Sequence, residues 1–242
     1  VCNAGEEGLG NLKGVHKICE DFGDRIERFC TFDSSLSSIV DRAVGSKRFR
    51  VRVRTRGGHS YDDFGNDNAI AGLASLVGKL YGIRVPEGGK TTYNVGMISG
   101  GTSVNTIAQE AEMLYEFRSD RRENLEYMER QFMEVFDRAK AEGMDVSFKV
   151  IGVRPCEGQV DPKRKQALSD WAHRVVEEMT GQAPKHCAGS TDCNIPLSLG
   201  IPSVCVGSFR GAGAHTWEEY VETDSLEEGY KVAFGMIFGS RD

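Results

Sequence analysis

A strict alternation of apolar and basic side chains between positions 48 and 56 constrains the fold most strongly. The two alternating sets are Phe49, Val51, Val53 and Thr55, and Arg48, Arg50, Arg52, Arg54 and Arg56. A period of two residues is typical of an antiparallel strand with one packed face and one wet face. Because the whole chain carries a net charge of −6, we interpret the arginines as a solvated sheet face and not as a nucleic-acid-binding surface.

Helix and strand patterns alternate after this strand. A helix capped by Asn66 or Asp67 is expected to bury Ile70, Leu73, Val77 and Leu80. A second helix carries Met128, Phe132, Val135 and Phe136, and strands are expected over residues 91–99, 111–118 and 146–150. The order β-α-β-β-α-β is the ferredoxin-like plan. With a hinge at Gly45-Ser46, residues 46–154 are predicted to form an inserted domain.

The flanking segments, residues 1–45 and 155–242, have the mixed character of an α/β domain. Asp161 begins a helix with proline in its first turn, and residues 202–206 are predicted to form a short buried strand. Ser225 opens a capping box for the final helix. The predicted fold class is therefore an α/β domain, built from both flanking segments, with an inserted ferredoxin-like α+β domain.

Composition limits the environment and the partners of the chain. Its 242 residues are 39% apolar and 27% charged, and no apolar run approaches the ~20 residues of a membrane span. No signal peptide is visible. The seven cysteines form no Cys-x-x-Cys pair, so we expect reduced thiols in a cytoplasmic protein. From the lack of a long apolar run and the negative net charge, we expect neither a membrane nor a nucleic acid as partner.

Two adjacent carboxylates, Glu6 and Glu7, stand on a glycine turn that follows two residues typical of a strand. Two ionised carboxylates in a shared site repel each other. A metal ion separates their roles, because one carboxylate can bind the cation while the other takes a proton from metal-bound water. A Glu-Glu pair alone is more often solvated surface, so the metal hypothesis depends on further ligands along the chain.

Three later residues are candidates for the same site. Asp33 follows a short apolar run, where open α/β sheets place their sites; an ordinary turn aspartate is the alternative. His215 lies among small residues that let the backbone approach a ligand, and the alternative is a plain loop histidine. Asp192 lies in the polar turn at 189–192. It could be a metal ligand, an acid next to the ligands that does not bind metal, or a helix cap, and we favour the acid next to the ligands or the cap.

Three polar residues of the inserted segment also stand out. His59 follows Gly57-Gly58 at the end of the arginine-rich strand, and Asn105 and Arg118 flank the strand around Ala111. An arginine in that place can clamp a carboxylate with two hydrogen bonds, although an exposed strand arginine is the alternative. The other histidines, His16, His173 and His186, have no comparable setting, and we interpret them as surface or packing residues.

Together, these segments resemble the dinuclear zinc exopeptidase family that includes peptidase T, glutamate carboxypeptidase, acetylornithine deacetylase and succinyl-diaminopimelate desuccinylase. The matching segments, in the order of that family, are residues 3–8, 32–33, 57–60, 100–105, 117–120, 189–192 and 213–216. The inserted ferredoxin-like segment matches the lid, or dimerisation, domain of the family.

The resemblance implies a role for each residue of the metal site. Glu6 matches the general base that deprotonates the bridging water. Glu7 and His215 match ligands of one zinc ion, and Asp33 matches a ligand of the other. Asp192 matches a motif that lies near the site without binding metal. The family pattern implies two zinc ions in each copy of the complete protein, with cobalt or manganese as substitutes.

The resemblance also implies contacts from the lid domain. His59 matches a histidine that reaches the active site of the partner copy, where it polarises the scissile carbonyl or stabilises its oxyanion. Asn105 and Arg118 match positions that contact the substrate's backbone carboxylate. A homodimer through the lid domain is therefore expected, with a short peptide or an N-acyl amino acid as substrate.

The chain departs from the family pattern at its start. The family has a His-x-Asp motif and a metal-bridging Asp before the Glu-Glu pair, and the sequence contains neither. We therefore expect an N-terminal portion to be missing and the chain alone to be inactive. For the complete parent we predict a di- or tripeptidase, with an N-acyl amino acid deacylase or a dimerisation module without catalysis as alternatives.

Overall fold

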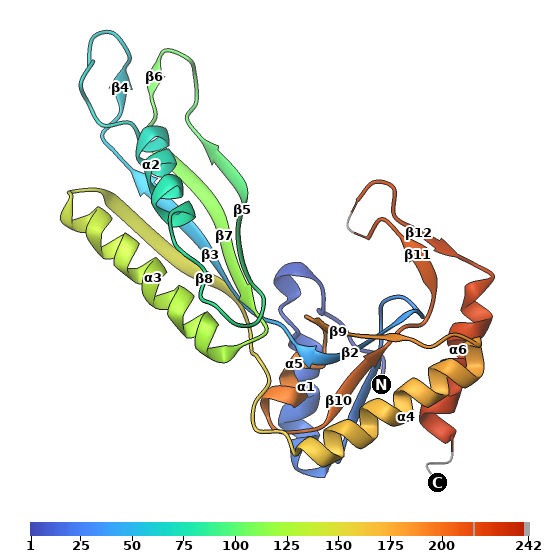
Figure 1. The fold of residues 1–242 in the computed structure, drawn as a ribbon. Coiled ribbons are helices and arrows are strands. Elements are labelled where there is room, and N and C mark those ends of the chain that lie inside the picture. Colours follow the sequence, from blue (N-terminus) through green and yellow to red (C-terminus); the bar gives the residue numbers. More distant parts are fainter. Residues whose placement is uncertain (215, 240–242) are drawn as a thin grey trace. The chain divides into compact units, whose positions relative to one another are not determined.

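The computed structural model describes residues 1–214 and 216–239 and divides into two compact units (Figure 1). Unit 1 combines Val1–Val44 with the chain from Arg154 onward, and unit 2 is the continuous segment Gly45–Val153. No helix within the described residues is long and apolar enough to cross a membrane.

A four-stranded sheet forms the centre of unit 1. Its strands, in spatial order, are β1 (Phe29–Phe32), β10 (Ser203–Val206), β2 (Ser38–Ala43) and β9 (Lys185–Gly189). β1 pairs with β10 in parallel, as β2 does with β9, whereas β10 and β2 run antiparallel. Each parallel pair joins a strand from the first part of the chain to one from the last part, so these two parts form one body.

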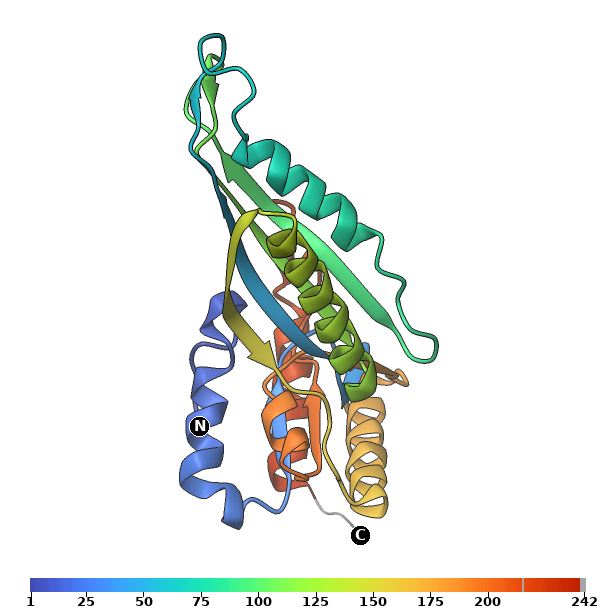
Figure 2. The same ribbon diagram turned by 90° about the vertical axis from the view of Figure 1, so that its left-hand side faces the viewer.

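Helices cover both faces of this sheet (Figure 2). They are α1 (Lys13–Phe22), α4 (Pro162–Thr180), α5 (Asn194–Ser198) and α6 (Ser225–Phe238). α4 and α6 share a core with Val204 and Val206 of the central strand. Cys205, between these two valines, packs instead with residues of α5, against which α1 lies. The period of two along a buried strand therefore gives each face its own helices.

Short elements complete unit 1. They are the 3-10 helices η1 (Gly8–Gly10) and η2 (Gly23–Arg25) and the hairpin strands β11 (Arg210–Ala212) and β12 (Tyr220–Glu222). The sequence predicted a strand end at Val1-Cys2, but residues 1–6 form no strand and both residues are exposed. Asp161 caps α4 as predicted, because its Oδ1 accepts hydrogen bonds from the N–H groups of Lys163 and Arg164.

Unit 2 has the predicted β-α-β-β-α-β order. Its main sheet contains, in spatial order, β5 (Thr91–Gly100), β7 (Glu110–Ser119), β3 (Gly45–Arg54) and β8 (Asp145–Arg154). The helices are α2 (Ala69–Tyr81) and α3 (Arg122–Ala141), and a two-stranded ribbon is formed by β4 (Gly58–His59) and β6 (Thr106–Ile107). The predicted fold class is confirmed; the ribbon is an addition to the predicted plan.

The alternation in β3 divides its side chains as predicted. Phe49, Val51 and Val53 are at most 1% exposed, and the ring of Phe49 stacks on that of Phe132 from α3 at 4.1 Å. The arginines occupy the other face, where they pair with glutamates of β7: Arg48 with Glu116, Arg50 with Glu112, Arg52 with Glu110 and Glu112, and Arg54 with Glu110. The basic stripe is thus neutralised within its own sheet.

Two local predictions were wrong, both at the starts of helices. The cap of α2 is Asn68, because its Oδ1 accepts from the N–H groups of Ile70 and Ala71 at 2.9 and 3.3 Å. The helix therefore buries Ala69, Leu73, Leu76 and Leu80, and Ile70 is 43% exposed. Gly45 and Ser46 are the first residues of β3, and the boundary between the two units falls directly before them, so the hinge at this place stays a prediction. Ser225 does not cap α6; its hydroxyl accepts from Arg210 N–H and donates to the Glu222 carbonyl.

Candidate metal centre

The loop that carries Glu6 and Glu7 is held against the start of α1 by main-chain hydrogen bonds. The N–H groups of Lys13 and Gly14 donate to the carbonyls of Gly5 and Ala4. A Cβ atom at Gly14 would lie 1.5 Å from Asn3 Oδ1, so only glycine allows this approach. The loop thus presents two adjacent carboxylates without a strand or helix of its own.

The side chain of Arg154 holds Glu6 in place by hydrogen bonds. The arginine is 4% exposed. Nη1 donates to Glu6 Oε1 at 2.9 Å and to Ser190 Oγ at 3.2 Å, and Nη2 donates to the Glu6 main-chain carbonyl. This residue was not among the predicted site residues. A signal existed, because Arg154 falls on the same alternate positions of β8 as the inward-facing Val146 and Phe148.

Asp33 lies at the carboxyl end of β1, as the sequence predicted. Its N–H donates to the Val206 carbonyl of the neighbouring parallel strand, and its Oδ1 accepts from Ser34 N–H at 2.8 Å. Ser34 has φ +83°, a conformation that turns the chain sharply after the strand. The carboxylate therefore stands at the sheet edge where open α/β folds place their sites.

Asp192 reaches the same region from the turn after β9. Its Oδ2 accepts a hydrogen bond from the side-chain amide of Asn3, three residues before Glu6. The residue is 7% exposed, and Oδ1 has no partner within the described residues. The cap position of α5 is Cys193, so of the predicted roles for Asp192 the helix cap is excluded.

Electrostatic interactions link the four carboxylates through Asp33: Glu6 interacts with Glu7 and Asp33, and Asp192 interacts with Asp33. Burial raises the pKa of Glu6, the Arg154 charge opposes this rise, and the charges of Glu7 and Asp33 add to it. Burial likewise raises the pKa of Asp192, where the hydrogen bond from Asn3 opposes the rise and the charge of Asp33 adds to it. Acidic residues from three distant parts of the sequence are therefore brought together with one buried cation.

The donor chemistry of this cluster suits a divalent cation, because carboxylate oxygens and imidazole are zinc ligands. The remaining predicted ligand, His215, lies outside the described residues. Within residues 1–214 and 216–239, no three His, Cys, Asp or Glu side chains are close enough to hold a metal ion together. The carboxylates are thus neighbours that do not by themselves complete a coordination shell.

The ribbon of unit 2 brings His59 and Asn105 together. β4 and β6 pair His59 with Thr106, and the Asn105 carbonyl accepts from Ser60 N–H at 3.0 Å. The His59 side chain is half-exposed, and its Nδ1 lies 3.4 Å from the N–H groups of Tyr61 and Asp62 and 3.3 Å from Asp62 Oδ2. A hollow of about 410 Å³ lies beside this ribbon.

Arg118 lies elsewhere in unit 2. It stands near the end of β7, paired in register with Thr92, whereas the ribbon joins the other end of that strand. Its guanidinium donates to both carboxylate oxygens of Glu116, at 2.7 and 3.1 Å. The structure therefore does not bring Arg118 together with Asn105.

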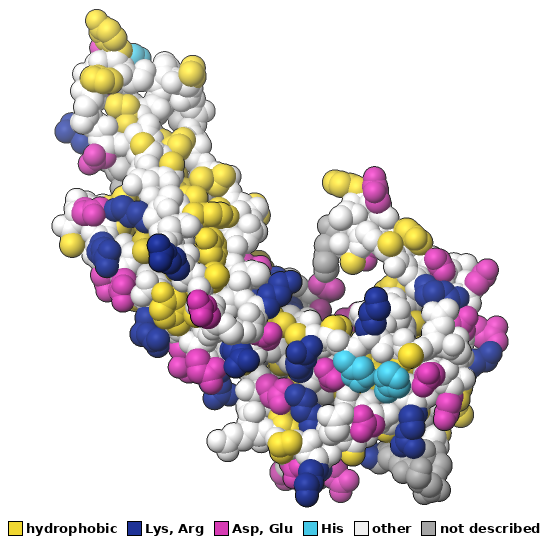
Figure 3. Space-filling model, in the orientation of Figure 1, with side chains coloured by type: hydrophobic (Ala, Val, Ile, Leu, Met, Phe, Trp, Pro, Cys, Tyr) yellow, Lys and Arg dark blue, Asp and Glu magenta, His cyan; other side chains and the backbone are white. Residues whose placement is uncertain are grey.

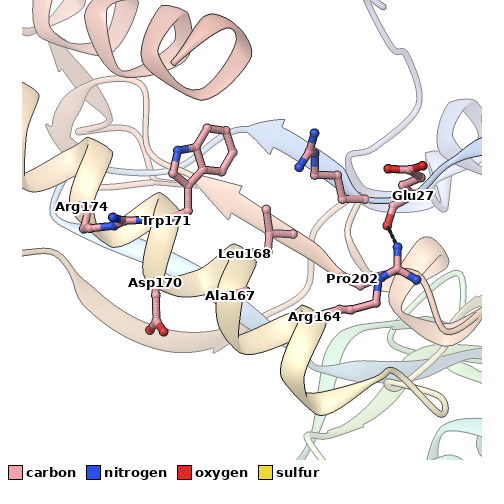
Figure 4. A pocket seen from close by; sticks show the side chains of 9 residues that line it. Glu27, Arg164, Ala167, Leu168, Asp170, Trp171, Arg174 and Pro202 are labelled. Atoms are coloured by element: carbon pink, nitrogen blue, oxygen red, sulfur yellow. Dashed lines mark hydrogen bonds between the residues drawn. The ribbon is translucent and has the colours of Figure 1, made fainter. Parts of the chain in front are cut away.

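A groove in unit 1 is separate from the acid cluster. Its volume is about 720 Å³, and it is lined by α4 residues such as Leu168 and Trp171, with Pro202 and Glu27 (Figure 4). Arg164 crosses one end of it, where a guanidinium N–H donates to the Glu27 carbonyl at 2.7 Å. None of the predicted site residues lines this groove.

Comparison with known proteins finds a family model that matches part of the chain. Residues 43–144 match the model of the M20 peptidase dimerisation domain. A Haemophilus influenzae homolog of a p-aminobenzoyl-glutamate hydrolase subunit is 35% identical over 119 residues, which are 49% of this chain and 26% of that protein.

Solved structures share the fold of nearly the whole chain. Aminopeptidase PepT from Bacillus cereus (23% identity, TM-score 0.70) and a tripeptidase from Staphylococcus aureus (20% identity, TM-score 0.72) each match 97% of this chain over 62% of their own. An aminobenzoyl-glutamate utilization protein from Klebsiella pneumoniae (16% identity, TM-score 0.65) matches 97% of this chain over 59% of its own.

The chain spans about a quarter of the curated relative and about three fifths of these solved structures. The resemblance found in the motifs is confirmed: residues 43–144 match a peptidase dimerisation domain of the M20 type, and nearly the whole chain shares the fold of an aminopeptidase and a tripeptidase.

Proposed function

We propose that this chain forms part of a metal-dependent hydrolase of peptide or amide bonds. The observation that carries the proposal is the acid cluster of unit 1, in which Arg154 engages one oxygen of Glu6. No described residue bonds the other oxygen, Oε2, so it remains able to accept a proton. The peptidases and amide hydrolases among the structural relatives support the same reaction class.

Each site residue then has a defined task. Glu7, Asp33 and His215 would hold zinc, with cobalt or manganese as substitutes, and Asp192 lies beside the site. Zinc bound there would supply a water of lowered pKa. Glu6 would act as the general base and acid, taking a proton from the attacking water and returning it to the leaving amine.

His59 and Asn105 act from the ribbon of unit 2. His59 Nδ1 faces groups of its own loop, namely the N–H groups of Tyr61 and Asp62 and the Asp62 carboxylate. We therefore assign Nε2, the other ring nitrogen, as the donor for a developing oxyanion. We place this donor in the active site of the partner copy. Asn105 contacts the substrate carboxylate. Arg118, at the other end of β7 and bonded to Glu116, does not share this contact in the arrangement that the structure shows.

A homodimer forms through unit 2, and the exposed edge of β5 is its contact surface. β5 pairs only with β7 among the described strands, and apolar side chains gather along β5 and α2 (Figure 3). Met97 and Ile98 of β5 are 64% and 58% exposed, and Ile70 of α2 is 43% exposed. A long apolar edge strand invites pairing with another chain, and a second copy of unit 2 satisfies it.

The preferred substrate is a di- or tripeptide, as the likeness to PepT and to a tripeptidase supports. The alternative is an N-acyl amino acid, which the 35% identity to a homolog of an aminobenzoyl-glutamate hydrolase favours. A dimerisation module without catalysis is the remaining alternative. The seven cysteines are free thiols, which fits the proposed cytoplasmic location.

Substitution of the proposed base tests the reaction directly. The longest polypeptide that the gene encodes is loaded with zinc and assayed with tripeptides and with N-acyl amino acids. Glu6→Gln is expected to lower kcat by about 10²–10⁴ with unchanged zinc content, because Glu6 is not a ligand. Glu20→Gln, an exposed acid of α1, is the matched control. Near-normal turnover by Glu6→Gln would show that Glu6 is not the base.

Mixed dimers test the placement of His59. His59→Ala is expected to cripple turnover, and mixing it with Glu6→Gln should restore part of the activity, because one site of the hybrid receives both intact residues. Absence of any rescue, with hybrid formation verified by mass spectrometry, would contradict action across the dimer.

A further inference from the structure

We propose that Arg154 is the positioning residue of Glu6, holding the glutamate so that one carboxylate oxygen is fixed and the other is presented to the reaction. The catalytic meaning of this inference rests on the proposed function, whereas the contact itself does not. Groups from two distant segments meet at one guanidinium: the carboxylate and carbonyl of Glu6, and the hydroxyl and carbonyl of Ser190.

Arg154 is the only partner found for the Glu6 side chain within the described residues. The rest of the loop is anchored elsewhere, by the Asn3 bond to Asp192 and by the main-chain bonds to α1. Loss of Arg154 therefore frees the Glu6 side chain and its carbonyl but leaves the loop attached at both sides. A free glutamate samples several rotamers, of which few present Oε2 in one direction.

The geometry requires an arginine. Nη1 and Nη2 are parts of one rigid planar fork, so the carboxylate and the main-chain carbonyl of Glu6 are fixed relative to each other. A lysine ammonium is a single point donor on a flexible stem. Lysine at this position preserves the charge but cannot occupy the positions of Nη1 and Nη2 at once.

The burial of Arg154 also separates it from the arginines of β3. It is 4% exposed, and its Nε finds no partner within the described residues. The arginines of β3 lie on a wet sheet face instead. A buried guanidinium with an incompletely satisfied donor set is costly, and its bonds to Glu6 are the compensation that the structure shows.

Hydrogen exchange on the 242-residue chain tests the contact without metal or substrate. The variants are Arg154→Lys and Arg154→Gln, and the matched control is Arg164→Gln, which removes another arginine bond to a main-chain carbonyl, that of Glu27 (Figure 4). We expect amides of residues 7–10 to exchange about ten- to a hundredfold faster in both Arg154 variants, the factor for losing a hydrogen bond to a charged group. The control should leave these rates unchanged.

Unchanged exchange in Arg154→Lys would overturn the inference. Should Arg154→Gln fail to fold, which circular dichroism would show, Arg154→Lys keeps the buried charge and decides the question. Ser190→Ala is a milder third variant, because it removes only the hydroxyl that holds Nη1 at 3.2 Å; we expect a smaller acceleration in the same direction.

Kinetics of the longest natural chain supply the catalytic readout. Arg154→Lys is expected to lower kcat at least about tenfold with unchanged KM and zinc content, since misplacement of the base affects the transition state and not substrate binding. A merely structural role would lower the folded fraction without changing kcat per folded molecule. If wild type hydrolyses no substrate while the exchange result holds, the proposed function fails and the contact stands. If wild type is active and Arg154→Lys keeps its kcat, the positioning role is wrong.

Discussion

Unit 1 and unit 2 differ in how their sheets are assembled from the sequence. Unit 2 is one continuous segment, and β3, β5, β7 and β8 follow one another within it. In unit 1, each parallel pair takes one strand from the start of the chain and one from near its end. Local patterns therefore describe unit 2 well, whereas unit 1 depends on distant contacts, and the candidate chemistry lies in unit 1.

The hydrophobic cores of the two units also differ. In unit 2, Phe49, Phe132, Phe136, Phe148 and Tyr115 form one aromatic cluster. The core of unit 1 is divided over the two faces of its sheet and built mainly from aliphatic side chains and cysteines. Unit 2 is thus a single packed layer under two helices, and unit 1 is a sheet between two helix pairs.

The largest expected effect is in the aromatic core. Phe132→Ala should destabilise unit 2 by about 3–5 kcal/mol, because Phe132 is fully buried and stacks on Phe49. Hydrogen exchange of β7 amides reports on unit 2, and both tryptophans, Trp171 and Trp217, report on unit 1. Urea unfolding followed by tryptophan fluorescence should keep its midpoint. Phe64→Ala, at 90% exposure, is the control.

An equal loss of stability in the exchange of β7 amides and in tryptophan-monitored unfolding would contradict the division into two cores. It would mean that the two units unfold as one cooperative body.

Helix caps offer a matched pair, one in each unit. Asn68 and Asp161 each accept hydrogen bonds from two main-chain N–H groups at the start of their helices. Asn68→Ala and Asp161→Ala should each cost about 0.5–2 kcal/mol, the first in the exchange of unit 2 and the second in tryptophan-monitored unfolding. Asp67→Ala is the control for the first, and a loss from Asp67→Ala as large as that from Asn68→Ala would contradict the assigned cap.

The start of α2 at Asn68 marks the limit of what the sequence predicts in unit 2. The alternation of β3 and the inward faces of Met128, Phe132 and Phe136 are borne out by burial. The phase of α2 was not predictable, because its sequence is apolar on nearly all sides and a stripe through Leu73 and Leu80 continues equally well through Leu76 or Val77. The face that is buried is set by the sheet below and not by the helix.

In unit 1, more of the structure depends on contacts between distant parts of the sequence. The positions of Glu6, Glu7 and Asp33 within electrostatic range support the cluster that the motifs predicted, yet the roles of these residues stay predictions. Arg154 was missed because its partners, Glu6 and Ser190, are 148 and 36 positions away. A local pattern can place an arginine on the inner face of a strand, but only the fold provides the carboxylate that it meets.

Acid should act in opposite directions on two buried or half-buried acids, one in each unit. Burial would raise the pKa of Glu116, but its bonds to Arg118 and Arg48 outweigh burial and lower it from 4.5. Its contribution to stability is therefore present above its ordinary pKa and is lost as pH falls through the lower folded value. The pKa of Asp192 is raised from 3.8, chiefly by burial, so its ionisation costs stability and acidification from neutral pH relieves that cost.

Urea unfolding of metal-free protein between pH 7 and pH 3 measures both responses. Glu116→Gln should weaken the loss of unit 2 stability below about pH 4.5, and Asp192→Asn should weaken the gain of unit 1 stability on mild acidification. Identical pH responses of wild type and both variants would contradict these assignments.

The smallest expected effect is in the arginine stripe of β3, although it is the most visible feature of the sequence. Arg50 Nε lies 3.3 Å from Glu112 Oε1, and both side chains are partly exposed. Arg50→Gln should change the stability of unit 2 by less than about 1 kcal/mol, because exposed ion pairs are screened by water and salt. A loss as large as that from Phe132→Ala would mean that these ion pairs, and not the aromatic core, stabilise this unit.

Zinc location by anomalous X-ray scattering, from crystals of the longest natural chain, tests the central claim most directly. We expect two zinc ions, one within about 2.0–2.2 Å of the Glu7 carboxylate and the His215 ring and the other within this distance of the Asp33 carboxylate, with Glu6 held by Arg154 and outside the coordination shell. Zinc bound elsewhere, or Glu7 and Asp33 on different surfaces with no metal between them, would contradict it.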